Sequence, residues 1–184
     1  MITIPYWQLV AGITVLWVLL RLCFAWKHRK VNWRYEGKLL TVWLCIVVIA
    51  RFVYFPLHPE NGRLGSLVLS VKDDSPVMFN LVPLVHLFDI YDERLINLFG
   101  NIAMFIPMGF IWPFCFRKLK GVGSAVLAGA GLSLLIELSQ LLAPDRNTDI
   151  DDLITNTVGA LIGAVLYFAL SRCFGKKKKE KAGS

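Results

Sequence analysis

A set of polar side chains that can take part in chemistry lies within or beside long apolar segments of this chain. They are carboxylates, carboxamides and arginines: Arg51, Asn97, Asn101, Glu137, Gln140, Arg146, Asp149, Asp152 and Asn156. Carboxylates near an arginine can hold a divalent cation through oxygen ligands, or they can perform acid–base chemistry on a polar headgroup. Glu137, Asp149 and Asp152 are therefore the candidate catalytic residues, although neither chemistry is required by the pattern.

The elements that must position these residues are membrane spans. The chain has 184 residues, of which 56% are hydrophobic and only 18% charged, with a mean hydropathy of +0.58. These values lie outside the range of soluble domains. Five apolar segments are long enough to cross a bilayer, and we predict transmembrane helices at residues 4–26, 39–57, 95–116, 122–143 and 153–174. The prediction is an all-α integral membrane protein, with residues 1–184 forming a single membrane domain.

The connection between the second and third predicted helices is too long for a simple turn. It contains apolar stretches at residues 64–71 and 77–88 that are too short to span a bilayer. Segments of this kind are usually interfacial or re-entrant. We expect this extracellular connection to lie partly against or within the membrane surface.

The charges of the connections predict the orientation. Lysine and arginine gather after the first and third spans and in a basic cytoplasmic tail at residues 175–184, whereas the other two connections are acidic. The positive-inside rule then places the N-terminus outside and the C-terminus in the cytoplasm. The net charge of +7 is explained by this pattern, so nucleic-acid binding is not indicated, and the expected partner is the lipid bilayer.

In this topology the polar residues converge on the outer side. Asn97 and Asn101 begin the third span and share a helix face, while Glu137 and Gln140 lie in the last turns of the fourth. Asp149, Asp152 and Asn156 share a face at the start of the fifth span, and Arg51 lies in the outer half of the second. The sequence therefore predicts an outward-facing polar pocket with these residues and Arg146 as ligand-binding candidates.

Structural explanations compete with this prediction. A carboxylate at mid-bilayer costs roughly 2.5 to 3.5 kcal/mol, so Glu137 should face the bundle interior, be protonated, or pair with a cation such as Arg51. Asp149 and Asp152 can act as helix caps, and the asparagines can form interhelical hydrogen bonds. Gly159 and Gly163 form a packing motif to which we assign no chemistry.

Recognisable catalytic and metal motifs are lacking in the sequence. There is no HExxH, GxSxG or Walker loop, and the four cysteines are at irregular spacing, which favours small core residues over a metal site or disulfide framework. We expect no cofactor and assign no metal site, and the oligomeric state is left open.

Several motifs in the same order resemble the VanZ-like family of bacterial membrane proteins over residues 80–167. They are Asn80-x-x-Pro83, the run from Asn97 to Phe110, Glu137-x-x-Gln140, Arg146, Asp149-x-x-Asp152, Asn156-x-x-Gly159 and Gly163. The resemblance implies a role in resistance to glycopeptide antibiotics, chiefly the lipid-tailed teicoplanin type. It implies no particular mechanism.

Three hypotheses follow for function. The first is a non-enzymatic membrane protein whose outer pocket engages an acylated antibiotic or a cell-wall lipid. The second is an integral-membrane enzyme that modifies a lipid or cell-wall precursor headgroup through Glu137, Asp149 and Asp152. The third is a structural partner of another membrane complex.

Overall fold

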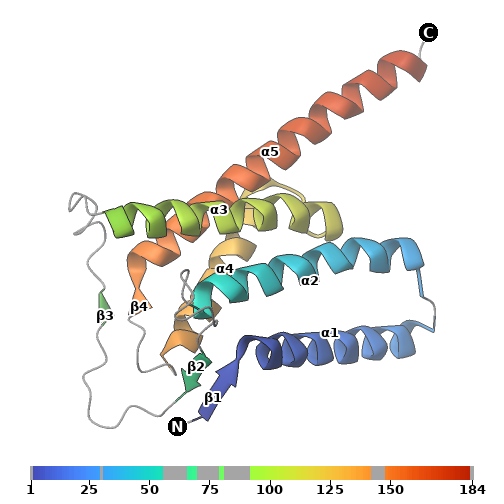
Figure 1. Cartoon of the computed structure of the whole chain (residues 1–184). Coiled ribbons are helices and arrows are strands. Elements are labelled where there is room, and N and C mark those ends of the chain that lie inside the picture. Colours follow the sequence, from blue (N-terminus) through green and yellow to red (C-terminus); the bar gives the residue numbers. More distant parts are fainter. Residues whose placement is uncertain are drawn as a thin grey trace. The chain divides into compact units, whose positions relative to one another are not determined.

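The protein is almost entirely helical in a computed structural model that describes residues 2–29, 31–55, 66–69, 79–80, 92–141 and 148–182. The helices are α1 (Tyr6–His28), α2 (Trp33–Tyr54), α3 (Asp92–Cys115), α4 (Val122–Gln140) and α5 (Ile150–Ala182) (Figure 1). Within the described ranges, these five helices are long and apolar enough to cross a membrane. The predicted all-α, multi-pass membrane fold is confirmed.

The helices do not stop where the apolar runs stop. The second helix begins at Trp33, ahead of its apolar run, because the Asn32 side chain caps it by accepting from the backbone N–H groups of Arg34 at 3.1 Å and Tyr35 at 3.3 Å. The last helix continues beyond the predicted span at residue 174 to Ala182. Lysine and glutamate are good helix formers, so the backbone can stay helical after the hydrophobic segment ends.

Four short strands accompany the helices: β1 (Ile2–Pro5), β2 (Ser66–Leu69), β3 (Phe79–Asn80) and β4 (Thr148–Asp149). They form two small ladders, β1 with β2 and β3 with β4. The rest of the connection at residues 56–91 that was expected to be interfacial or re-entrant lies outside the described residues. The chain divides into two compact units, described separately below.

Unit 1 comprises Met1–Phe79 and Leu138–Thr148. Its helices α1 and α2 form a hairpin (Figure 1). At one end β1 pairs antiparallel with β2, with Ile4 opposite Leu67, and a small core forms around the buried Phe55 and Leu67. The Tyr6 ring meets Phe55 edge to face, with centroids 5.3 Å apart. The beginning of α1 and the end of α2 are therefore joined at the same end of the hairpin.

An ion pair joins the two helices near the other end of the hairpin. Arg21 of α1 donates from Nε to Glu36 of α2 at 2.8 Å, and its terminal nitrogen pairs with the second carboxylate oxygen. The guanidinium also lies 5.9 Å from the centre of the Tyr35 ring. By contrast, no side chain described for α1 is buried. The first helix therefore relies on contacts near its two ends, with its apolar sides left for lipid.

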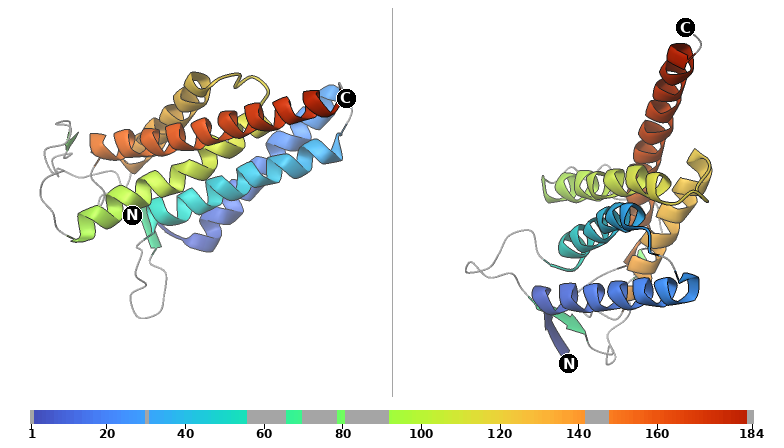
Figure 2. Two further views of the ribbon diagram at one scale, coloured as in Figure 1. Left: turned by 90° about the horizontal axis from the view of Figure 1, so that it is seen from above. Right: turned by 90° about the vertical axis from the view of Figure 1, so that its right-hand side faces the viewer.

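Unit 2 comprises Asn80–Glu137 and Asp149–Ser184. Its helices α3 and α5 pack against each other, and the C-terminal part of α5 extends beyond α3 (Figure 2). A Cβ added at Gly159 would come within 2.2 Å of the Ile102 carbonyl oxygen, and one at Gly163 within 2.1 Å of the Ile106 carbonyl oxygen. The two glycines thus let the backbones of α3 and α5 touch, as the predicted packing motif requires.

Proline does not interrupt α3. Pro107 and Pro113 both lie inside the continuous helix Asp92–Cys115. Membrane helices tolerate proline when neighbouring groups compensate for the lost backbone bond.

Candidate ligand-binding site

The polar residues of unit 2 are built around the start of α5. Asp149 immediately precedes the helix, and its Oδ1 accepts the backbone N–H of Asp151 at 3.0 Å. This is the contact of a helix N-cap, and the acids of the first turn are favoured by the helix dipole. This contact supports the structural explanation for Asp149, in which its side chain caps α5.

Glu137 connects the end of α4 to this cap. The residue is only 4% exposed, and its Oε2 accepts the backbone N–H of Asp149 at 3.3 Å. The backbone that Glu137 contacts at Asp149 leads directly into the first turn of α5, which contains Asp152. The interaction between α4 and the start of α5 therefore depends on a buried acid beside two further carboxylates, an arrangement that apolar packing does not require.

Asp152 is tied to the third helix of this unit. Asn101 of α3 donates from Nδ2 to Asp152 Oδ1 at 2.6 Å, a short hydrogen bond to a carboxylate. Asn97, one turn earlier on the same helix, is exposed. The structure thus brings Asn101 to the acidic residues, whereas Asn97 shows no comparable contact among the described residues.

A second, deeper contact lies one turn before Glu137 in α4 and one turn after Asp152 in α5. Asn156 donates from Nδ2 to Ser133 Oγ at 2.9 Å, and the two residues are 3% and 0% exposed. Asn156 Oδ1 is buried and has no hydrogen-bond partner among the described residues. We call Ser133, Glu137, Asp152 and Asn156, together with Asn101 and Asp149, the polar layer.

Ser133 was not among the ligand-binding candidates from the sequence. Its position four residues before Glu137, on the same face of α4, was the available signal. Serine is so common in membrane helix contacts that this spacing alone does not single it out.

Two of the predicted site residues that the structure describes belong to unit 1. Gln140 is 7% exposed, and its buried Oε1 has no hydrogen-bond partner in the described part of the chain. Arg51 donates to the Phe55 carbonyl oxygen at 3.3 Å and lies 5.8 Å from the Phe52 ring centre. The proposed pairing of Arg51 with Glu137 stays a prediction, because the two residues belong to different units.

Arg146 lies outside the described residues, as does Pro83 of the first motif. Among the residues that are described, no group of three or more histidine, cysteine, aspartate or glutamate side chains is arranged to hold a metal ion. The arrangement offers hydrogen-bond acceptors and negative charge, which suit a ligand with donor groups.

Comparison with known proteins gives two matches, a family and a single protein, and both carry the name VanZ. The family described as VanZ/LLP1 matches residues 40–171. A curated protein of Enterococcus faecium, "Protein VanZ", is 26% identical over 145 residues, covering 79% of this chain and 84% of that protein. No solved structure matches this chain.

Proposed function

We propose, from the premise that this chain belongs to the VanZ/LLP1 family, that it protects the cell against lipid-tailed glycopeptide antibiotics such as teicoplanin. The polar layer would engage the acylated antibiotic or a cell-wall lipid at the membrane surface. The family match includes the whole region of residues 80–167 whose motifs resemble VanZ-like proteins, so the resemblance is confirmed. The resistance role comes from that resemblance.

One observation carries the proposal: the burial of Glu137 inside an apolar helix, beside Asp149 and Asp152. An acid buried among apolar residues costs free energy if it stays charged and unpaired. A glutamine would accept the same backbone N–H from Asp149 without that cost. The acid itself is therefore best explained by a ligand that it contacts.

The geometry also permits a second function. A carboxylate pair such as Glu137 and Asp152 can transfer protons, so an integral-membrane enzyme acting on a lipid or cell-wall headgroup is the alternative. Comparison of lipid and cell-wall species from cells with and without the protein tests it. A new or missing species that depends on Glu137 would favour the enzyme, and unchanged species would count against it.

The proposal also requires the polar layer to face outward. The charge pattern predicts that the N-terminus and the two acidic connections lie outside. The pairings of β1 with β2 and of β3 with β4 support this, because each pairing joins two of these segments. Alkaline phosphatase, which is active only outside the cytoplasm, should be inactive when fused after Ser184. Full activity of that fusion would contradict this orientation.

Substitution of the buried acid tests the proposed function directly. Glu137→Gln keeps the acceptor for Asp149 but removes the charge, so the protein should fold while protection against teicoplanin is lost. Glu36→Gln makes the same chemical change in unit 1 and should preserve protection. The measurement is the inhibitory concentration in cells with matched amounts of membrane-inserted protein. Undiminished protection by Glu137→Gln would overturn the proposal.

A further inference from the structure

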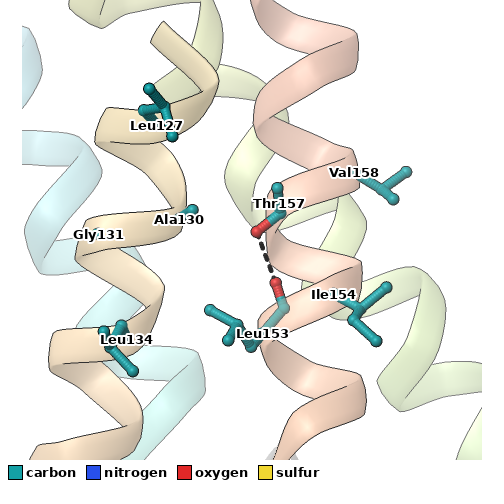
Figure 3. Close-up of a pocket in the computed structure, with 8 residues that line it drawn as sticks. All are labelled: Leu127, Ala130, Gly131, Leu134, Leu153, Ile154, Thr157 and Val158. Atoms are coloured by element: carbon teal, nitrogen blue, oxygen red, sulfur yellow. Dashed lines mark hydrogen bonds between the residues drawn. The ribbon is translucent and has the colours of Figure 1, made fainter. Parts of the chain in front are cut away.

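The middle of unit 2 offers lipid an apolar surface. The hollow between α4 and α5 is lined by leucine, isoleucine, valine, alanine and glycine, together with Thr157 (Figure 3). The Thr157 hydroxyl donates to the Leu153 carbonyl oxygen of its own helix at 2.7 Å, so it is satisfied within the helix. Such walls suit lipid chains, and contacts with polar lipid heads are left to the two ends of the unit.

The end of unit 2 opposite the polar layer is basic. Glu137 lies near the end of α4, whereas the connection that precedes the start of α4 holds three cations within four residues. They are Arg117, Lys118 and Lys120, and all three side chains are exposed. The connection lies between the candidate spans Leu95–Cys115 and Val122–Gln140, which places these cations at the edge of the hydrocarbon region, at the level of the lipid heads.

The helix α5 adds a fourth cation at the same level. Phe110 of α3 meets Tyr167 of α5 with ring centroids 5.7 Å apart, and these two residues are 57 positions apart in the chain, as are the two glycine contacts described above. The same offset places Arg172 level with Cys115, the last residue of α3. The Arg172 side chain is also exposed. We call Arg117, Lys118, Lys120 and Arg172 the basic end.

Interactions within the protein do not account for these charges. Cations stabilise a helix dipole at the last turn, but α5 continues beyond Arg172 to Ala182, and the last turn of α3 holds no basic residue. Among the residues that the structure describes, the ion pair is that of Arg21 with Glu36 in unit 1, and no acid pairs with the basic end. The four positive charges are therefore left for a partner outside the chain.

We propose that the basic end of unit 2 binds anionic phospholipids through their phosphate groups. Lysine and arginine near a membrane surface attract anionic lipids, and arginine can hold a phosphate with two parallel hydrogen bonds. An added Cβ at Gly121 or at Gly123 meets nothing within 4 Å, so the start of α4 has space for a lipid head. In the predicted orientation these lipids belong to the cytoplasmic leaflet. The inference does not depend on the proposed function, which concerns the other end of the unit.

The test measures lipid binding to the full chain in a neutral detergent by native mass spectrometry. Phosphatidylglycerol should bind more tightly than phosphatidylcholine with the same acyl chains, because choline balances the charge of the phosphate. Each cation near the membrane surface contributes about fivefold to affinity. The triple variant Arg117→Gln, Lys118→Gln and Lys120→Gln should therefore weaken binding of phosphatidylglycerol about 100-fold and leave phosphatidylcholine unchanged. Arg172→Gln alone should weaken it about fivefold.

Two controls separate a site from the net charge of the protein. Exchanging lysine for arginine, and arginine for lysine, at the three positions before α4 keeps the charge and should change the affinity less than about twofold. A second triple variant, Lys27→Gln, Arg29→Gln and Arg34→Gln, removes as much charge from unit 1, where these exposed cations are spread over eight residues. It should cost less than about fivefold. All of the changed side chains are exposed, and thermal melting in the same detergent confirms that the variants are folded.

Three results would overturn the inference: equal affinity for the two lipids, unchanged affinity for phosphatidylglycerol in the triple variant of the basic end, or equal losses in the two triple variants. The last result would identify attraction to the net charge of the protein instead of a site in unit 2. Protection against teicoplanin is the readout of none of these measurements, so their failure leaves the proposed function untouched.

Discussion

The α1–α2 hairpin and the α3–α5 pair are both made of apolar helices, but they are held together in different ways. No described side chain of α1 is buried, and its contacts with α2 include the Arg21–Glu36 ion pair, whose side chains are about a quarter exposed. In the α3–α5 pair, Gly159 and Gly163 bring the two backbones into contact, and Asn101 bonds to Asp152.

The difference follows from the solvent. Lipid competes for apolar side chains as well as another helix does, so hydrophobicity alone does not join helices in a membrane. Small residues and interhelical hydrogen bonds do, and they are concentrated in unit 2. The contrast predicts that identical changes have unequal effects in the two regions.

The largest effect is expected at the glycines. Gly163→Leu would force a side chain against the Ile106 carbonyl, and we expect a loss of about 3 kcal/mol in the free energy of unfolding, or no folded protein. Gly12→Leu in α1, where an added Cβ meets nothing within 4 Å, should change it by less than about 0.5 kcal/mol. Denaturant unfolding of the purified chain in detergent measures both. Equal losses would break the comparison.

An intermediate effect is expected at the buried hydrogen bond of unit 2. Ser133→Ala and Asn156→Leu each remove one partner, and the double variant completes a cycle. The coupling should be about 0.6 kcal/mol and no more than about 1.7 kcal/mol, the range for hydrogen bonds between membrane helices. Additive losses would show that Asn156 does not stabilise the fold through Ser133.

The smallest effect is expected at the ion pair of the hairpin. Arg21→Met with Glu36→Gln should reduce stability by about 0.2 to 1 kcal/mol, since partly exposed pairs contribute little. The difference from wild type should shrink in high salt, because screening weakens what the pair contributes. A loss as large as that of Gly163→Leu would mean that the hairpin is held more like the α3–α5 pair.

The sequence predicted the helices well because span length and hydropathy are local properties. It also predicted that Gly159 and Gly163 are packing residues, and their close approach to α3 agrees with this. The positions of helix ends were less predictable, since they depend on caps such as Asn32 and on helix propensity beyond the apolar run.

Predicting the site was harder because its contacts depend on how deep each helix sits. The spacing of Asn97 and Asn101 placed both on one face of α3. It does not show which of them lies level with the start of α5, the helix that α3 contacts. Asn101 meets Asp152, while Asn97 remains exposed. The strand pairing of β1 with β2 was missed for a related reason: it joins residues far apart in sequence, and the β-branched residues Ile2, Thr3 and Ile4 were the only local sign of it.

The β1–β2 ladder also has a consequence for biogenesis. Ile2–Pro5 is synthesised before α1, yet its partner Ser66–Leu69 follows the entire second helix. The ladder can therefore close only after both α1 and α2 have been inserted with their connected ends on the same side of the membrane. A large domain fused directly before Ile2 would hinder the pairing of β1 with β2, which is the last contact of the hairpin to form. Tags for this protein are therefore better placed elsewhere.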